Sequence, residues 1–189
     1  MLGDLATLNL LYIVISIVIG LSVHEAMHAF TAHWLGDTTA KEEGRVSLNP
    51  LRHIDPFTTI LLPIITLIIF KIPILAAKPV PFNPERVRYE EFGSAMIAAA
   101  GPLTNLVLAI TAAPLLSIVA LGPFAEFLAI FIQLNVVLFI FNILPIPPLD
   151  GSRVLYAFAP EPLQRFMDQI EPYGLFIVFG LVLTGVLIP

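Results

Sequence analysis

Long apolar runs separated by short polar stretches dominate the pattern of this 189-residue chain. A helix needs about 20 mostly apolar residues to cross a bilayer, and most of the apolar runs approach or exceed that length. The runs cover residues 5–35, 57–75, 94–121, 124–144 and 173–188. This pattern predicts an all-α polytopic membrane protein, and we expect residues 1–189 to form a single domain.

The positively charged residues indicate how the chain crosses the bilayer. Lys and Arg collect in cytoplasmic loops, and both the 36–56 loop and the 78–92 loop contain them. The run 57–75 therefore begins and ends on the cytoplasmic side, and it is cut into short pieces by Pro63, Lys71 and Pro73. We expect this run to form a re-entrant hairpin, which is tolerated where protein or a watery cavity covers its backbone.

The remaining four runs predict about four transmembrane helices. The helix over 5–35 runs from outside to inside, the helix over 94–121 returns, and the helix over 124–144 comes back in. The run 173–188 then leaves again. Mixed charged and apolar residues over 153–171 predict a short amphipathic helix on the cytoplasmic side.

Composition narrows the possible functions. Charged residues make up only 12% of the chain, whereas a soluble domain has about 25%, so a separate soluble domain is excluded. The net charge of −5 argues against binding to nucleic acid. The chain has no cysteine, so any metal ion must be held by His, Asp or Glu side chains.

An HExxH motif occupies residues 24–28, inside the first apolar run. On a helix His24 and His28 lie about 40° apart around the axis. This places both imidazoles on one face, where they can coordinate Zn²⁺ together. Glu25 is placed to act as a general base. The motif lies roughly 18 Å before the helix end at Gly36, which is within the membrane, where costly ionisable groups mark a functional site.

A catalytic zinc site usually has three protein ligands, so the motif needs a third. His33 is rotated by about 140° from the face of the two motif histidines. His53 and Asp55 fall in a loop, where a role in a cap or turn is favoured. Asp150 is the better candidate. Prolines break the preceding helix and would leave an extended strand that returns Asp150 to the cytoplasmic end of that helix. On spacing alone, a plain turn role for Asp150 is an equal alternative.

Together, the HEAMH motif and the sequence NILPIPPLDG over 142–151 resemble the two signatures of the site-2 protease family of intramembrane zinc metalloproteases. The chain resembles the minimal members, which lack PDZ and CBS domains. Further familiar stretches cover 44–50, 77–84 and 100–105. The resemblance implies that one zinc ion is bound by His24, His28 and Asp150, that Glu25 is the general base, and that Asn142 is a polar group near the substrate.

The resemblance also implies a function, namely regulated cleavage of a peptide bond within or beside a transmembrane helix of another membrane protein. We expect a multi-pass protein of a prokaryotic plasma membrane with its active site open to the cytoplasm. Because a helical substrate must unwind to be cut, we expect short cytoplasmic-side β-strands over 45–48 and 74–82 to pair with it.

Two other functions remain open on the sequence. Ionisable residues in membrane helices could form the ion path of a metal-binding transporter, although such proteins more often show paired repeats of interrupted helices. A catalytically silent relative that only binds membrane helices is the second alternative. Asn105 is expected to form an interhelical hydrogen bond rather than to take part in the site.

Overall fold

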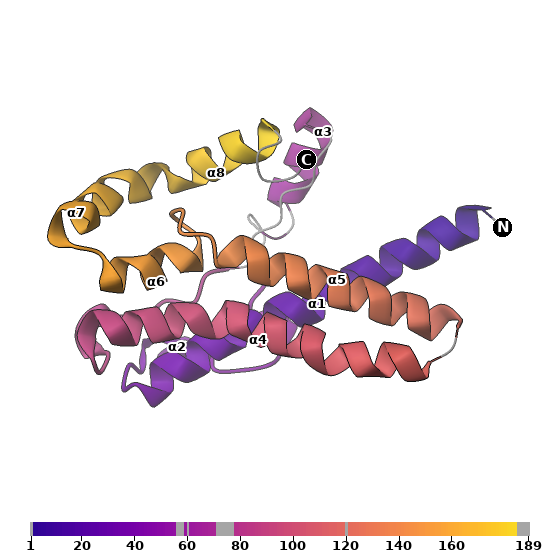
Figure 1. The fold of residues 1–189 in the computed structure, drawn as a ribbon, viewed down its shortest axis with the longest axis horizontal. Coiled ribbons are helices and arrows are strands. Elements are labelled where there is room, and N and C mark those ends of the chain that lie inside the picture. Colours follow the sequence, from indigo (N-terminus) through magenta and orange to yellow (C-terminus); the bar gives the residue numbers. More distant parts are fainter. Residues whose placement is uncertain (1, 56–58, 60, 71–77, 120, 185–189) are drawn as a thin grey trace.

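Three long helices form the body of the molecule in the computed structural model, which describes residues 2–55, 59, 61–70, 78–119 and 121–184. They are α1 (Leu2–Trp34), α4 (Glu90–Ile118) and α5 (Pro123–Asn142). Helices α4 and α5 form an antiparallel hairpin, and α1 packs against both (Figure 1). In the described chain these are the helices that are long and apolar enough to cross a membrane.

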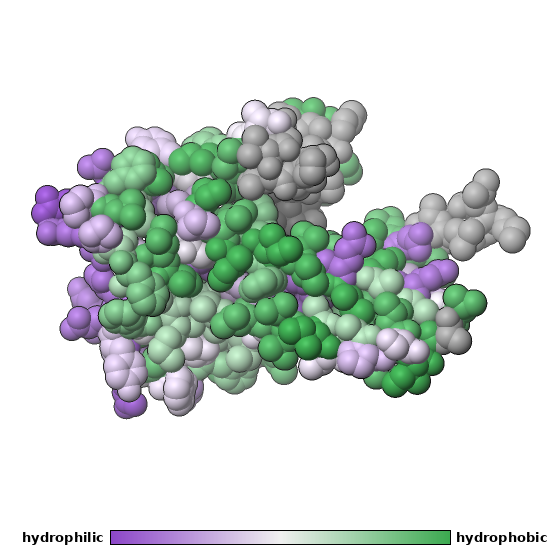
Figure 2. Space-filling model, viewed as in Figure 1, coloured by the Kyte–Doolittle hydropathy of each residue, from purple (hydrophilic) through white to green (hydrophobic). Residues whose placement is uncertain are grey.

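Shorter helices fill the connections. Those between α1 and α4 are α2 (Thr39–Glu42), η1 (Pro50–Arg52), α3 (Leu62–Phe70) and η3 (Pro84–Arg86). Those after α5 are α6 (Asp150–Phe158), α7 (Glu161–Ile170), η4 (Glu171–Tyr173) and α8 (Gly174–Leu183). Helices α6 and α7 lie at the end of the molecule where α4 begins, and hydrophilic side chains gather over this end (Figures 1 and 2).

Small residues bring the three long helices close together. On α1 the side chains of Ala26, Ala29 and Ala32 are fully buried, and Ala98 and Ala109 are buried on α4. Small side chains allow helix backbones to approach closely, and this is how helices associate where lipid removes the hydrophobic driving force. Large apolar side chains such as those of Leu10, Val107 and Ile118 instead point outward, as a lipid-facing surface requires.

The expected β-strands are not found in the described residues, so this part of the predicted fold is wrong there. Residues 46–48 form bends and Arg45 has no regular structure, because their loop bonds to itself: Arg45 donates to the carbonyl of Arg52, and His53 Nε2 donates to the carbonyl of Ser47 at 2.7 Å. Residues 78–82 also lack strand structure, and 74–77 lie outside the described residues.

The connection from α5 to Asp150 also differs from the expectation. Instead of an extended strand, residues 143–149 form tight turns, in which Ile146 donates to the carbonyl of Leu144 and Leu149 donates to that of Ile146. The amphipathic segment is two helices, α6 and α7, because Pro160 disfavours helical backbone in the residue before it.

Two predicted membrane segments are covered only in part. Within 57–75 the structure describes the nine-residue helix α3, and residues 71–75 lie outside the described chain. Within 173–188 it describes the ten-residue helix α8, and residues 185–188 lie outside. The re-entrant hairpin and the fourth crossing therefore stay predictions.

Asp37 ties the end of α1 to the segment that leads into α4. Its fully buried carboxylate accepts hydrogen bonds from the backbone N–H of Thr39 (3.0 Å), the hydroxyl of Thr39 (2.6 Å) and the backbone N–H of Asn83 (2.7 Å). Burial alone would raise the pKa of Asp37, but these donors favour the charged form and hold the pKa below its usual value of 3.8.

We predict that Asp37→Ala lowers the stability of the purified protein by about 1–3 kcal/mol, because buried N–H groups lose their acceptor. Since the pKa of Asp37 is depressed in the folded state, its contribution is present above the unfolded pKa and is lost as pH falls through the folded pKa. The difference in melting temperature between wild type and variant should be constant from about pH 5 to pH 7 and shrink below about pH 4. A difference that grows on acidification would contradict this role.

Candidate metal centre

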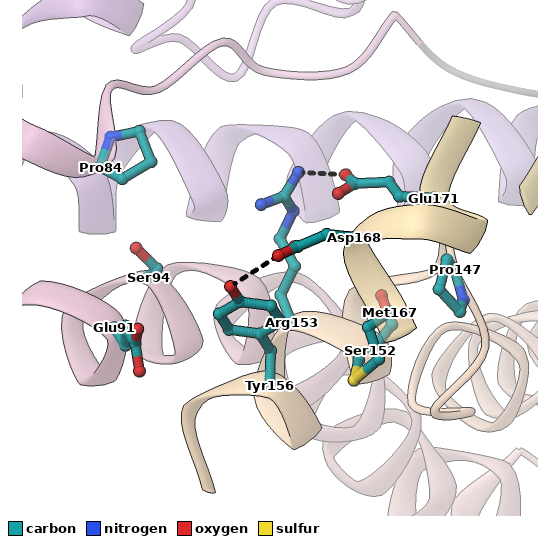
Figure 3. Close-up of a pocket in the computed structure, with 10 residues that line it drawn as sticks. All are labelled: Pro84, Glu91, Ser94, Pro147, Ser152, Arg153, Tyr156, Met167, Asp168 and Glu171. Carbon is teal, nitrogen blue, oxygen red and sulfur yellow. Dashed lines mark hydrogen bonds and ion pairs between the residues drawn. The ribbon is translucent and has the colours of Figure 1, made fainter. Parts of the chain in front are cut away.

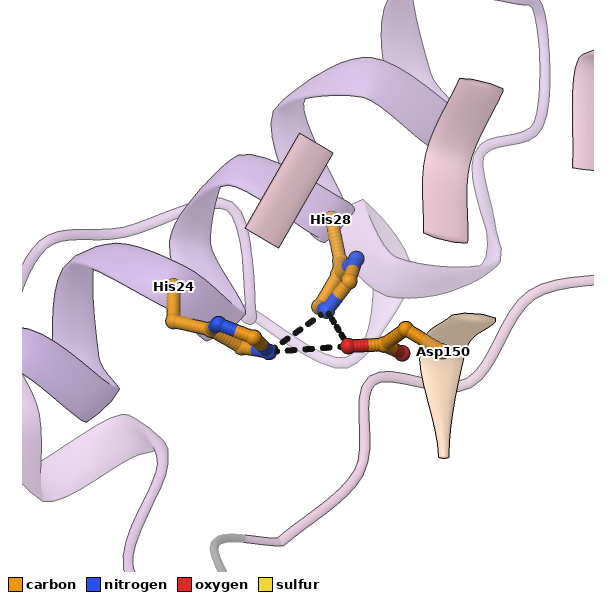
Figure 4. Close-up of side chains that lie close together, drawn as sticks. All are labelled: His24, His28 and Asp150. Atoms are coloured by element: carbon orange, nitrogen blue, oxygen red, sulfur yellow. Dashed lines mark hydrogen bonds and ion pairs between the residues drawn. The ribbon is translucent and has the colours of Figure 1, made fainter. Parts of the chain in front are cut away.

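Three side chains from distant parts of the chain converge at one point (Figure 4). His24 and His28 project from α1, and Asp150 is the first residue of α6. The two Nε2 atoms lie 3.0 Å apart, and Oδ2 of Asp150 lies 3.1 Å from Nε2 of His24 and 3.4 Å from Nε2 of His28. Both histidines are buried, and the Asp150 side chain is 23% exposed.

The other ring nitrogen of each histidine is held by α4. Nδ1 of His24 donates to Oδ1 of Asn105 at 2.6 Å, and Nδ1 of His28 donates to the backbone carbonyl of Ile97 at 2.7 Å. The orientation of the Asn105 amide is fixed independently, because its Nδ2 donates to the carbonyl of Gly20 (3.1 Å) and to Oδ1 of Asn135 (2.9 Å). These partners assign the hydrogen of each neutral imidazole to Nδ1.

This assignment means that the converging atoms are all electron-rich. Both Nε2 atoms carry a lone pair, and the third atom belongs to a carboxylate, so the cluster needs a cation between its members. Tetrahedral zinc with bonds of about 2.0–2.1 Å would hold its ligand atoms roughly 3.3 Å apart. The observed separations of 3.0–3.4 Å therefore fit a zinc ion.

Helix α4 fits against the histidines through one stripe of residues, Ile97, Gly101 and Asn105, which are spaced by four and share a helix face. Gly101 lies between the two groups that hold the rings. A Cβ atom added there would lie 2.6 Å from Cε1 of His28 and 2.7 Å from Cε1 of His24, far inside van der Waals contact. Only glycine lets the two imidazoles approach the backbone of α4 this closely.

A second glycine places Asp150. The turns over 143–149 fold back under the start of α6, and a Cβ atom on Gly151 would overlap the carbonyl groups of Ile143 and Leu144. The close packing that Gly151 permits brings the first turn of α6 to the histidines. Helix α6 also packs along α4, which already holds both rings.

The remaining predicted site residues differ in their placement. Glu25 is buried and its carboxylate interacts electrostatically with His24, His28, Asp150 and His53. Asn142 is half-buried and donates to the carbonyl of Leu138 in its own helix at 2.9 Å. No hydrogen bond within the described chain joins Asn142 to the three converging side chains.

Asn105 and Asn135 are the site residues that sequence reasoning missed. Asn105 was expected to bond between helices, and it does so, but its Oδ1 accepts from the ring of His24. Both amides are fully buried, and Asn135 keeps its own orientation by donating to the carbonyl of Phe131 at 2.8 Å. The sequence did contain a signal for Asn105, which lies four residues after Gly101 on the same helix face. Burying an amide in an apolar helix costs free energy unless the amide has a specific hydrogen-bond partner.

A cavity of about 290 Å³ lies beside this centre, between the start of α4 and helices α6 and α7 (Figure 3). Its wall includes Ser152, two residues after Asp150. Arg153 pairs with Glu171 at 2.8 Å, and the Tyr156 hydroxyl donates to Asp168 at 3.3 Å. The converging histidines do not line this cavity, so it is a neighbouring feature and not the metal centre itself.

Two buried histidines on a membrane-length helix, a carboxylate that converges on them from a second helix, and an adjacent buried glutamate define a class of protein, the membrane-embedded metal-dependent hydrolases. The sequence profile of peptidase family M50 matches residues 117–185 of the chain. YwhC of Bacillus subtilis (strain 168), whose name marks it as a candidate zinc metalloprotease, is 39% identical over 178 residues, which are 89% of this chain and 78% of YwhC.

Two further relatives carry names of the same kind. Rip2 of Mycolicibacterium smegmatis is 30% identical over 175 residues, and MJ0611 of Methanocaldococcus jannaschii is 34% identical over 137 residues; the matches cover 88% and 72% of this chain. The chain spans 64% of the length of each of these two relatives. No solved structure matches the chain significantly.

The chain belongs to peptidase family M50, the site-2 protease family, and the resemblance seen in the sequence is confirmed. It is a zinc-dependent metalloprotease of the intramembrane type, and the transporter alternative is not favoured. The cluster of His24, His28 and Asp150 is the place in the described chain where such a metal ion fits.

We predict that Gly101→Ala reduces the zinc content of the purified protein at least about tenfold, because the new methyl group displaces both imidazoles. Metal analysis of the purified protein measures this directly. Gly180→Ala is the matched control, since a Cβ atom at Gly180 meets nothing within 4 Å. Equal zinc content in both variants would contradict the placement of the rings against α4.

We predict that Asn105→Ala weakens zinc binding about 10–100-fold, because His24 loses the acceptor that fixes its tautomer and ring orientation. Asn142→Ala serves as the comparison, since its amide bonds within its own helix, and it should leave the zinc affinity unchanged. Competition with a chelator gives both affinities. If Asn142→Ala weakened binding more than Asn105→Ala, the assignment of these two amides would be reversed.

Proposed function

We propose that this protein cleaves peptide bonds within or next to transmembrane helices of other membrane proteins, using a zinc ion held by His24, His28 and Asp150. The observation that carries the proposal is the convergence of these three ligand atoms within 3.4 Å, with each imidazole already hydrogen-bonded at its other nitrogen. Residues 1–189 act as one domain in this proposal, because helices α1 and α6, which are far apart in the sequence, contribute ligands to one metal centre.

In this proposal Glu25 is the general base. Zinc, when bound, supplies a Lewis acid that polarises the scissile carbonyl and makes water more acidic. Glu25 accepts a proton from the attacking water and passes it to the nitrogen of the leaving amine, as general acid–base catalysis requires. Its burial beside the ligands keeps the carboxylate in a confined region, where an electrostatic interaction is stronger than in water.

We further propose the membrane arrangement. Helices α1, α4 and α5 cross the bilayer, 173–188 provides a fourth crossing, and 57–75 is a re-entrant segment. The Lys and Arg residues of the 36–56 and 78–92 loops support a cytoplasmic position for the end of α1 that follows the metal centre. Water and substrate would then reach the site from the cytoplasm, in a prokaryotic plasma membrane.

The partial exposure of Asp150 supports an open path to the centre. The histidines are buried between α1 and α4, whereas the carboxylate of Asp150 lies at the edge of the cluster with 23% of its side chain exposed. A substrate helix must unwind before its carbonyl can reach this edge, because helical carbonyls are held in hydrogen bonds. Asn142 would contact the substrate segment in this proposal, which rests on the family resemblance.

We predict that Glu25→Gln retains zinc and loses cleavage by at least about 10³-fold, since general-base catalysis contributes 10²–10⁴-fold and the amide cannot accept the proton. Purified wild type and variant, each reconstituted in lipid vesicles, are incubated with a panel of single-span polypeptides that contain a helix-weakening Pro in the membrane segment. Gel analysis gives the cleaved fraction, and metal analysis gives the zinc content.

The same vesicles test the transporter alternative. Zinc that enters the vesicles with wild type and with Glu25→Gln at equal rates, without any cleavage, would overturn the protease proposal. A variant that binds no zinc would show instead that residue 25 acts in metal binding.

A further inference from the structure

His53 presents a buried nitrogen without a partner. The residue follows η1, its side chain is only 3% exposed, and within the described part of the chain its Nδ1 makes no hydrogen bond. The other nitrogen, Nε2, lies 2.7 Å from the backbone carbonyl of Ser47. A carbonyl oxygen only accepts, so Nε2 carries the hydrogen and Nδ1 of the neutral ring is an acceptor with a free lone pair.

The surrounding loop fixes this ring against the helix that carries the HExxH motif. Helix η1 packs on α1, and His53 belongs to the group of residues that interact electrostatically with Glu25. The backbone carbonyl of His53 accepts from the N–H of Lys78 at 3.1 Å, and the buried Arg45 donates to the carbonyl of Arg52 just before it. The acceptor at Nδ1 is therefore fixed in a loop that packs against the helix of the proposed general base.

A buried acceptor without a donor destabilises a fold, and natural proteins commonly satisfy such groups with a water molecule that makes about three hydrogen bonds. Here a second acceptor, the carboxylate of Glu25, lies within electrostatic range of the ring. A water molecule has two hydrogens to donate, so one Nδ1 atom and one carboxylate oxygen satisfy it completely. Its lone pairs then point away from both side chains.

We propose that His53 is a further catalytic residue, whose Nδ1 holds the attacking water together with Glu25. The proposal rests on the proposed function. Glu25 accepts the hydrogen that is transferred, and His53 accepts the one that stays on the oxygen, so the water is oriented with a lone pair toward the scissile carbonyl carbon.

The bonds balance without any further reactant. The O–H bond to Glu25 breaks as the new C–O bond forms, and Glu25 then gives this proton to the amine nitrogen as the C–N bond breaks. The hydrogen facing His53 remains on the new carboxyl group and leaves to solvent as the carboxylate forms.

Two substitutions test the roles of the two ring nitrogens of His53 separately. The amide oxygen of His53→Asn lies close to the position of Nδ1 and keeps an acceptor there, but the side chain is too short to donate to Ser47. The longer side chain of His53→Gln reaches toward Ser47 with its amide nitrogen and leaves no acceptor at the Nδ1 position. A purely structural histidine would be replaced best by Gln, and a catalytic acceptor best by Asn.

We expect His53→Gln to lower kcat about 100-fold with KM changed less than about threefold, whereas His53→Asn stays within about tenfold of wild type. The assay is the cleavage of the single-span polypeptides with a central Pro in lipid vesicles. The opposite ranking, or equal activity of wild type and His53→Gln, would overturn the proposal.

Zinc content and melting temperature are measured for each variant, and we expect both to stay at the wild-type values in His53→Gln. Leu51→Ala is the matched control, because this η1 side chain is 74% exposed and its removal should leave kcat unchanged. Loss of zinc or of folding in both His53 variants, with activity lost in proportion, would assign His53 a structural role and reject the proposal.

The Glu25→Gln variant separates a failure of the role proposed for His53 from a failure of the proposed function. If wild type cleaves, Glu25→Gln does not, and His53→Gln matches wild type, only the role of His53 is wrong. If zinc-loaded wild type cleaves no member of the panel, or Glu25→Gln cleaves as fast as wild type, the proposed function itself fails.

Discussion

The structure depends on the mutual approach of two imidazole lone pairs and one carboxylate. Nε2 of His24, Nε2 of His28 and Oδ2 of Asp150 lie within 3.0–3.4 Å of one another, and two of the three residues are buried in a membrane-length helix. Electron-rich atoms at these distances repel one another unless a cation lies between them. The packing of α1, α4 and α6 is therefore coupled to metal binding, as it is in other proteins whose ligands exist as a set only in the folded state.

Helix α4 shows how this constraint shapes the rest of the molecule. One face of the helix supplies a carbonyl acceptor at Ile97, a gap at Gly101 and an amide acceptor at Asn105. The two acceptors are eight residues apart on α4, and Gly101 lies midway between them, where the two rings come closest to the helix backbone. Asn135 then extends the network to α5 by fixing the Asn105 amide. All three membrane-length helices of the described chain thus take part in orienting a single histidine ring.

The sequence predicts the parts of this arrangement that local geometry determines. The apolar runs predict the three long helices, and the i, i+4 spacing predicts that His24 and His28 share a face. Asp150 was chosen as the third ligand from the expected topology. A helix that runs toward the cytoplasm and is broken by prolines had to end near the cytoplasmic side, which the two histidines also approach. The turns over 143–149 were predicted as a strand, since prolines exclude a helix but do not choose between an extended and a folded path. The strand over 45–48 failed because backbone groups of this segment bond within one loop: the N–H of Ser47 donates to the carbonyl of Arg45, and the carbonyl of Ser47 accepts from His53.

The partners of the histidines could not be assigned from the chain alone. Asn105 and Asn142 look alike in sequence, each a single amide in an apolar run, and only the packing of α4 on α1 shows which one meets an imidazole. His53 was placed in an ordinary turn for the same reason, since its burial depends on a contact between η1 and α1 that no periodicity reveals.

X-ray absorption at the zinc edge of the purified wild-type protein reports the atoms that surround the metal ion. We expect about four nitrogen or oxygen neighbours at about 2.0–2.1 Å, with the multiple-scattering signature of two imidazoles. We also expect this two-imidazole signature to be lost in His28→Ala. A spectrum of bound zinc without imidazole neighbours, or one that His28→Ala leaves unchanged, would contradict a zinc ion held by His24, His28 and Asp150.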